Sequence, residues 1–182
     1  MGISEEKVAL RTRYRQERNA RYIEHSFEHL ADIPEIQSAQ VIASYMSYGD
    51  EPSTKELNQK LLAMGKLLLL PRISGKDLEW VQWSGDHSSL LEKRKIFEPK
   101  GEVFGQLEKV EVVIVPALRI DRNGYRLGQG GGYYDRALPH FAAWTIGLIH
   151  PDEISSTDLP REEWDFPLFA AATPDLVLRF NR

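Results

Sequence analysis

The sequence of 182 residues contains no cysteine, which excludes a disulfide framework, a thiolate nucleophile and a cysteine-ligated zinc site. It also lacks a strong excess of one charge, because 23 basic and 27 acidic residues leave a net charge of -4. A protein that coats nucleic acid usually carries a basic surface, so this balance argues against a nucleic-acid partner. No apolar run is long enough for a transmembrane helix or a signal sequence. We therefore expect a soluble, cytoplasmic monomer that does not bind a membrane.

The length of the chain suits one domain with a substantial core, so we expect a single domain over residues 1–182. Apolar, β-branched runs alternate with stretches of helical character, and several of these runs are apolar on both faces. Such a pattern is typical of a mainly parallel sheet that helices cover on each side. The predicted fold class is therefore α/β, a three-layer α/β/α sandwich.

Local signals predict where these elements begin and end. A first helix should run from Ser4 to about Leu30, because a candidate cap and two acidic residues open it. Ser53 and Glu56 form a candidate capping box for a second helix, which Gly65 can close. Strands are expected at residues 41–47, 66–71, 78–83, 110–118, 144–150 and 175–180, with 78–83 as a hairpin partner or an edge strand.

In parallel α/β sheets, ligands bind beyond the carboxyl ends of the strands. The segments that follow the expected strands should therefore share one crevice. These segments are residues 49–51, Arg72, the glycine-rich loop and residues 150–152.

The glycine-rich loop, RLGQGGGYYDR at residues 126–136, places four glycines within five residues. Glycines adopt positive φ without steric cost, so several backbone N–H groups can point at one anion, and a short helix from about Tyr133 would add its N-terminal dipole. A glycine cluster alone is more often a structural turn. Arg126 and Asp135 change this balance, because they supply a phosphate partner and a hard oxygen ligand for magnesium.

The stretch NGYRLGQGGGYYDR resembles the GxRLGxGxGYYD signature of the 5-formyltetrahydrofolate cyclo-ligases, also called 5,10-methenyltetrahydrofolate synthetases. Further segments agree with this family in order and spacing: a K-x-x-x-R pair at Lys7 and Arg11, SYMSYGDEPST, VIVPAL and LPREEWD. The chain departs from the family at HPDEISSTD, where many relatives carry a glutamine. The resemblance nevertheless covers most of the chain.

The resemblance implies an activity and a fold. Members of the family use ATP and Mg²⁺ to convert 5-formyltetrahydrofolate to 5,10-methenyltetrahydrofolate with release of ADP and phosphate. Their sheet is related to those of ribose isomerases and CoA transferases. The partners that it implies are these small-molecule substrates.

The resemblance also assigns residues, and each assignment is carried over to a matching position. For ATP they are Lys7, Arg11, Arg126, Leu127, Gly128, Gln129, Gly130, Gly131, Gly132, Tyr133 and Tyr134. For folate they are Met46, Glu51, Gln129, Gly130, Gly131, Gly132 and Tyr133. Asp135 and Asp165 match the magnesium ligands, and Arg126 is the catalytic residue that stabilises the transferring phosphoryl group.

Helical geometry places five residues within an arc of about 100°: Lys7, Arg11, Tyr14, Arg15 and Arg18. For Arg15 and Arg18 we favour an ordinary face of the helix that is exposed to solvent. For Lys7 and Arg11, the charge pattern alone favours solvent exposure and nucleotide binding equally.

Two other classes of function remain open from the sequence. An isomerase or transferase acting on phosphorylated sugars would need a base or a nucleophilic carboxylate in the loop, and the loop has neither before Asp135. A non-catalytic protein that binds folate and nucleotide would keep the same cleft. Net acidity counts against the use of such a cleft for RNA.

Overall fold

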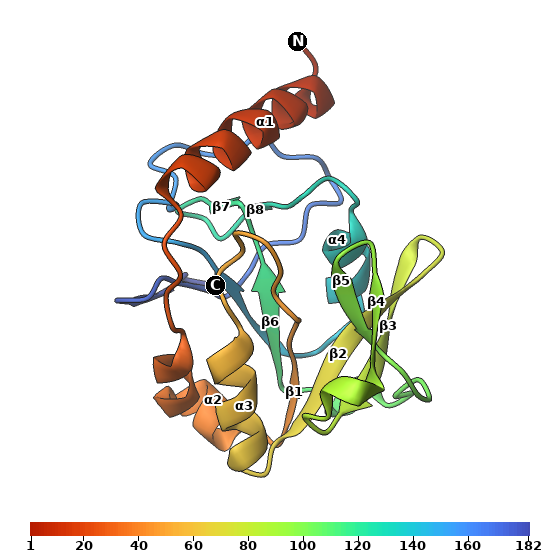
Figure 1. Cartoon of the computed structure of the whole chain (residues 1–182). Coiled ribbons are helices and arrows are strands. Elements are labelled where there is room, and N and C mark those ends of the chain that lie inside the picture. Colours follow the sequence, from red (N-terminus) through yellow and green to blue (C-terminus); the bar gives the residue numbers. More distant parts are fainter.

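The computed structural model describes residues 1–182 and is built around one seven-stranded sheet (Figure 1). The strand order is β11-β10-β9-β6-β1-β2-β3. The five inner strands are parallel, and the edge strands β3 and β11 run antiparallel to their neighbours. The strands of this sheet are β1 (Val41–Ala43), β2 (Leu67–Ser74), β3 (Asp77–Trp83), β6 (Val112–Pro116), β9 (Trp144–Leu148), β10 (Ala170–Ala172) and β11 (Val177–Arg179). The predicted α/β class with a mainly parallel sheet is therefore confirmed.

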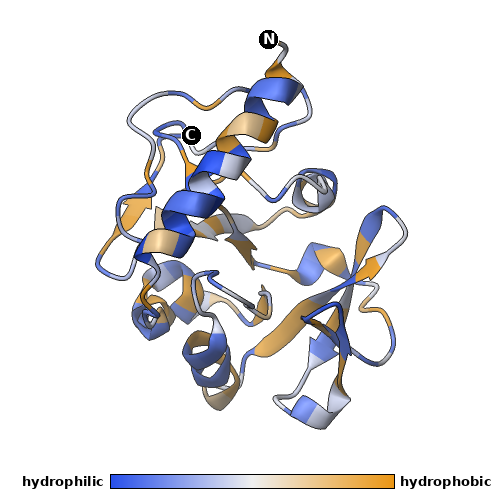
Figure 2. Ribbon diagram, turned by 45° about the horizontal axis from the view of Figure 1, so that its top comes forward, coloured by the Kyte–Doolittle hydropathy of each residue, from blue (hydrophilic) through white to orange (hydrophobic).

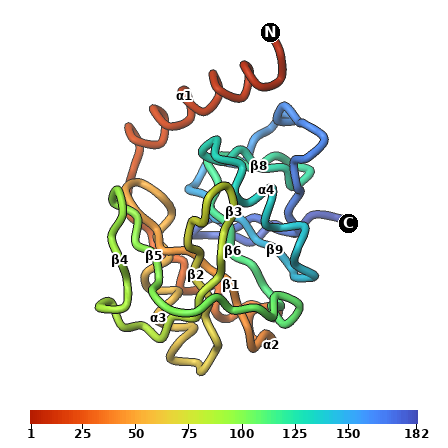
Figure 3. Tube along the Cα trace, turned by 90° about the vertical axis from the view of Figure 1, so that its right-hand side faces the viewer, coloured from red at the N-terminus to blue at the C-terminus, as the bar shows by residue number.

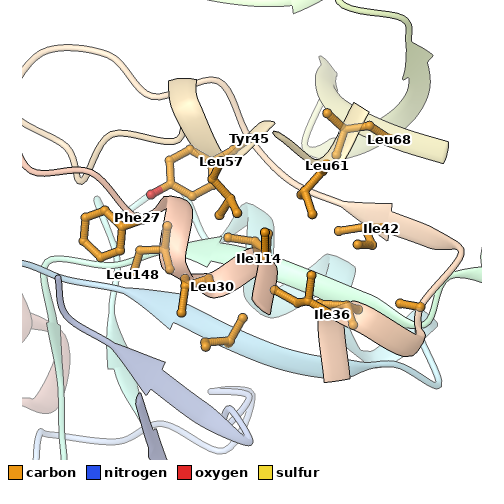
Figure 4. Close-up of a cluster of buried hydrophobic side chains, with 14 of the residues drawn as sticks. Phe27, Leu30, Ile36, Ile42, Tyr45, Leu57, Leu61, Leu68, Ile114 and Leu148 are labelled. Atoms are coloured by element: carbon orange, nitrogen blue, oxygen red, sulfur yellow. The ribbon is translucent and has the colours of Figure 1, made fainter. Parts of the chain in front are cut away.

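Helices cover both faces of the sheet. The helices are α1 (Ile3–Arg21), α2 (Pro34–Ser38), α3 (Lys55–Ala63), α4 (Tyr133–Ala137) and the 3-10 turns η1 (Glu28–Asp32), η2 (His87–Ser89), η3 (Leu107–Lys109) and η4 (Leu138–His140). On one face, η1, α2 and α3 bury a core with alternate residues of the strands, as Figure 4 shows for Leu57, Leu61, Ile42 and Ile114. On the other face, α4 and η4 pack over the strand residues that alternate with these and point the other way, including Val113 and Val115.

Helix α1 belongs to neither layer and crosses the carboxyl-terminal end of the sheet (Figure 1). Its surface is largely hydrophilic (Figure 2), and polar side chains attach it to the rest of the chain. The most buried of these is Arg18, whose guanidinium donates to both carboxylate oxygens of Glu153 at 2.9 and 2.7 Å and to the carbonyl of Ala117 at 2.7 Å. Our interpretation of Arg18 as a solvated residue was therefore wrong.

We expect Arg18→Ala to lower the free energy of unfolding by about 3–5 kcal/mol, because it leaves the carboxylate of Glu153 buried without its counter-ion. The matched control is Arg13→Ala, which removes a pair with Glu17 from a side chain that is 68% exposed. Exposed pairs of this kind contribute less than about 1 kcal/mol. Urea denaturation of both variants measures the difference, and equal small losses would show that the Arg18 pair does not anchor α1.

Several boundaries differ from those that the sequence predicts. Helix α1 ends at Arg21, not near Leu30, and residues 28–32 form the separate turn η1. Helix α3 begins at Lys55 with Thr54 as its N-cap residue, so the capping box at Ser53 and Glu56 is also wrong. The hydroxyl of Thr54 instead donates to the carbonyl of Tyr45 at 2.6 Å. Gly65 follows α3 with a φ of +78°, as expected for a helix stop.

Two small antiparallel sheets complete the fold: β4 (Leu90–Lys93) with β5 (Ile96–Pro99), and β7 (Arg119–Ile120) with β8 (Arg126–Leu127). The first hairpin is attached to β2 by Arg72, which donates to the carbonyl of Pro99 at 3.2 Å. The second carries the chain from β6 into the glycine-rich loop. No helix is both long enough and apolar enough to span a bilayer.

Candidate active site

A cavity of about 450 Å³ lies beyond the carboxyl ends of the central strands, under α1. Its size is in the range of small-molecule sites. The floor is formed where β6 ends, at Pro116 and Ala117, and where β2 continues through Pro71 and Ile73. The walls come from the glycine-rich loop, from the first turns of α1 and from the turn at residues 162–165.

The loop needs glycine for its conformation and for its own packing. Gly130 and Gly132 have φ values of +110° and +69°, which strain any other residue. Gly132 is also the N-cap residue of α4, so the loop runs directly into that helix. At Gly131 an added Cβ would lie 2.6 Å from the ring of Tyr133. The result is a bare backbone that faces the cavity at the start of a helix.

Arg126 lies in this wall as a nearly buried cation, with only 4% of its side chain exposed. Its partners are distant: the carbonyl of Pro116 at 3.4 Å and a carboxylate oxygen of Asp135 at 3.6 Å. The guanidinium also lies over the ring of Tyr134, 5.4 Å from its centroid, and its buried Nε has no hydrogen-bond partner. Burying a charge with so few partners is costly, so this arrangement suits a site where an anion completes the coordination.

Two carboxylates flank the same part of the cavity. Asp135 accepts from the backbone N–H of Phe166 at 3.3 Å, and Asp165 accepts from the backbone N–H of Glu162 at 2.9 Å. The ammonium of Lys7 contacts Asp165 and lies 2.9 Å from the carboxylate of Glu162. No group of three or more histidine, aspartate or glutamate side chains is placed to hold a metal ion alone. Magnesium is commonly held by one or two carboxylates together with substrate phosphates, so Asp135 and Asp165 fit that mode.

Two further cations of α1 contact the glycine-rich loop. Arg11 donates to the carbonyl of Gly128 at 2.9 Å, and Arg15 donates to the side chain and the carbonyl of Gln129 at 2.7 and 2.6 Å. Burial, and then the neighbouring charge of Arg15, lower the pKa of Arg11. Arg15 is exposed but anchored, so it does not simply face solvent as we had favoured. Leu127 is buried beneath the loop and also lines the cavity.

The far side of the cavity carries a carboxylate in a different environment. Glu51 follows β1 and accepts from the backbone N–H of Tyr48 at 3.0 Å, while Met46 packs beside it against the core. Burial raises the pKa of Glu51 from its ordinary value of 4.5 to about 7, although the Tyr48 hydrogen bond lowers it. Burial likewise raises the pKa of the Tyr134 hydroxyl, which keeps that group neutral. Glu51 can therefore offer either a carboxylate or a carboxylic acid near neutral pH.

The raised pKa of Glu51 predicts a dependence of stability on pH. Between pH 4.5 and 7 the folded protein binds a proton at Glu51 that the unfolded chain does not, so stability should fall as pH rises through this window and level off above it. Glu51→Gln keeps an acceptor for Tyr48 without the charge. It should stabilise the protein above pH 7 by on the order of 3 kcal/mol and have little effect below pH 4.5. Urea unfolding across this range measures the effect, and a difference that does not change with pH would contradict the assignment.

Comparisons with known proteins identify the family of this chain. The sequence profile of the 5-formyltetrahydrofolate cyclo-ligase family matches residues 3–174. The chain belongs to the 5-formyltetrahydrofolate cyclo-ligase family. It is 34% identical over 152 residues to the 5-formyltetrahydrofolate cyclo-ligase of Escherichia coli, covering 79% of this chain and 83% of that protein. It is 32% identical over 150 residues to the enzyme of that name from Haemophilus influenzae, covering 78% and 80%.

A solved structure supports the same family. The NMR structure of Aquifex aeolicus 5,10-methenyltetrahydrofolate synthetase matches with a TM-score of 0.80 and 28% identity, over 97% of this chain and 93% of that chain. The resemblance of the sequence to the cyclo-ligases is therefore confirmed, and the chain is an enzyme of that family. Membership decides against the phosphosugar isomerase or transferase.

The cavity of this cyclo-ligase-family chain brings together every residue to which the sequence assigns a site. All of them line it: Lys7, Arg11, Met46, Glu51, Arg126, Leu127, Gly128, Gln129, Gly130, Gly131, Gly132, Tyr133, Tyr134, Asp135 and Asp165. Two segments expected in the crevice are absent from its lining. Arg72 instead pairs with Glu79 at 2.9 Å and holds the β4–β5 hairpin. Residues 150–152 do not line the cavity, and Glu153 of the same turn attaches α1 through Arg18, which itself lines the cavity.

Sequence reasoning missed two parts of the wall. Ile96, Phe97 and Glu98 of β5 line one side, and Trp164 lines another. Glu98 is buried and accepts from the backbone N–H of Ile73 at 2.6 Å, so it also fixes the hairpin against β2. The motif LPREEWD contained Trp164, but an aromatic residue beside two acids gave no separate signal.

Proposed function

We propose that this protein converts 5-formyltetrahydrofolate to 5,10-methenyltetrahydrofolate with consumption of ATP and release of ADP and phosphate. The observation that carries the proposal is the position of Arg126. This cation is buried between a bare glycine loop and the carboxylate of Asp135, and its Nε lacks a partner. A site of this kind suits the binding and transfer of a phosphoryl group.

In the proposed reaction the formyl oxygen attacks the γ-phosphorus of ATP. A phosphorus–oxygen bond forms as the bond to the leaving ADP breaks. Nitrogen N10 of the folate then attacks the activated formyl carbon and loses its proton, and the carbon–oxygen bond breaks to release phosphate, which carries that proton away. Phosphorylation is needed because the oxygen of an amide is a poor leaving group. The protein therefore has to hold two ligands in line and stabilise charge, and it forms no covalent bond itself.

The proposal assigns tasks to each part of the cavity. The N–H groups of the loop from Gly128 to Gly132, together with Lys7 and Arg11, bind the phosphates. Asp135 and Asp165 would hold Mg²⁺, and the ion would supply positive charge to the phosphates. The acidic group of Glu51 binds the N–H-rich edge of the folate beside Met46, and Gln129 to Tyr133 contact both ligands.

The whole site comes from one chain, with wall residues from Ser4 to Asp165. This supports our proposal that residues 1–182 act as a single domain and as a monomer, since no second copy is required to complete the cavity.

The experiment that tests the function mixes purified protein with 5-formyltetrahydrofolate, ATP and Mg²⁺ and follows the absorbance of the methenyl product. Product that forms only when ATP and Mg²⁺ are both present supports the proposal. Binding of both ligands without product would instead identify a non-catalytic folate- and nucleotide-binding protein on the same fold.

A further inference from the structure

Trp164 is an exposed aromatic side chain on a wall of the cavity. Its side chain is 66% exposed, whereas Trp80 and Trp83 are 2% and 3% exposed in the core. It nevertheless lines the cavity together with Ser4 and Lys7 of α1. An indole in this position gains little from burial in the free protein, but a flat ring laid on it would remove the apolar surfaces of both from water.

The backbone holds Trp164 in a defined place. It lies in the turn from Glu162 to Asp165, which is closed by a hydrogen bond from the N–H of Asp165 to the carbonyl of Glu162 at 3.1 Å. Asp165 also accepts from the N–H of Glu162, and both acids contact Lys7. The next residue, Phe166, donates to Asp135. The turn is thus fixed to α1 on one side and to α4 on the other, so the backbone that carries the indole is held in place.

The topology separates this turn from the expected folate side. Met46 and Glu51 follow β1, and Phe97 lies on the hairpin that is attached to β2. The turn with Trp164 leads instead toward β10, which lies on the other side of β6 and β9 in the sheet. Figure 3 shows the β4–β5 hairpin and the segment around residue 160 on opposite sides of the molecule below α1. The glycine-rich loop, which follows β8, lies between them and contacts α1 through Gly128.

We propose that Trp164 forms the binding surface for the purine base of the nucleotide. This inference rests on the proposed function: if the glycine-rich loop holds the phosphates and their terminal group points at the folate near Glu51, the base must extend toward the opposite wall. Trp164 is the aromatic side chain on that wall, next to the carboxylates that would hold the metal. Stacking on an indole uses the flat face that every base has, so it adds affinity for the base. The phosphates are bound independently by other residues.

The first test uses the fluorescence of the unaltered protein. Trp80 and Trp83 are buried, and Trp144 lies at the start of β9, away from the cavity, so acrylamide should quench mainly Trp164. Saturation with ATP should protect this emission, and saturation with inorganic tripolyphosphate, which has no base, should not. Protection that is equal with both ligands, or absent with ATP, would overturn the proposal. Failure of either ligand to bind would instead count against the proposed function.

The second test uses three variants. Trp164→Ala should weaken ATP binding by about tenfold, within the range measured for base stacking on aromatic residues. The affinity for tripolyphosphate and the KM for 5-formyltetrahydrofolate should stay within about twofold of wild type, and Trp164→Phe should retain most of the ATP affinity because it retains a ring. Phe169→Ala is the matched control, since Phe169 is 39% exposed but does not line the cavity. Equal losses for ATP and tripolyphosphate would mean that Trp164 only supports the metal-binding turn, and a raised KM for folate alone would place the other substrate on the ring.

Discussion

Arg126→Ala should lower kcat by about 100- to 1,000-fold, the effect of removing one preorganised donor from a site where charge develops. The guanidinium is nearly buried, and its distances of 3.4 Å to Pro116 and 3.6 Å to Asp135 leave it weakly bound by the protein. Its full interaction is therefore reserved for the ligand, and it should be strongest with the transferring phosphoryl group. For the same reason, the variant should lose little stability. Rates at saturating substrate and thermal unfolding measure the two quantities separately.

Two further variants sharpen this test. Arg126→Lys keeps a positive charge but loses the planar fork of donors, so it should recover only part of the rate. Arg122→Ala removes an exposed arginine from the turn before the loop and should leave kcat unchanged. A folded Arg126→Ala protein with the kcat of wild type would remove Arg126 from the mechanism.

Asp135→Asn should lower kcat/KM by about 100-fold or more, because it removes a negative charge from the place where we position Mg²⁺. Asparagine keeps the size of the side chain and an oxygen that can accept from the N–H of Phe166, so the contact between α4 and the 162–165 turn survives. The Mg²⁺ concentration for half-maximal activity should rise by more than about tenfold, a loss that even outer-shell substitutions cause at metal sites. A titration of activity with Mg²⁺ measures this shift.

The control for Asp135 is Asp32→Asn, which neutralises a carboxylate that is 65% exposed and lies outside the cavity. Binding of Mn²⁺ in the presence of ATP, followed by electron paramagnetic resonance, provides a readout that does not depend on turnover. If Asp135→Asn required the same concentration of either metal as wild type, the metal would be held elsewhere, and Asp165 would be the next carboxylate to replace.

The parts of this fold that the sequence predicted are those with strong local signals. Residues 112–115 are β-branched and apolar on both faces, as a central parallel strand requires, and β6 occupies that position in the sheet. The short helix after the glycine-rich loop begins at Tyr133 as expected. Arg126 and Asp135 beside the glycines pointed to a ligand-binding loop, and the loop does line the cavity, but the roles of its individual residues came from the resemblance to the family.

The parts that were missed depend on tertiary contacts. Strand β10 is a run of three alanines with little β-propensity, and it is a strand because it pairs with β9. The β4–β5 hairpin turns at Arg94 and Lys95, which adopt positive φ values of 50° and 68° without glycine. The usual glycine-containing turn signal of a hairpin was therefore absent, so the hairpin and the cavity wall on β5 were not predicted.

Burial also could not be read from local patterns. Arg18 has the sequence neighbours of a solvated helix residue, and its partner Glu153 is 135 positions away. The raised pKa of Glu51 has the same origin, because it depends on what covers the carboxylate and not on the residues beside it. Sequence reasoning selected side chains that the fold brings to one cavity, but it did not predict the environment that shifts their pKa values.

The long sequence separation of the contacts made by α1 has a consequence for biosynthesis. Lys7 emerges early from the ribosome, whereas its partners Glu162 and Asp165 are synthesised 155 and 158 residues later. Helix α1 can form locally as soon as it emerges, but it cannot dock at this end until most of the sheet has been made. A nascent chain therefore has no closed cavity during most of its translation, and the ATP binding that we propose should arise late, in nearly full-length chains.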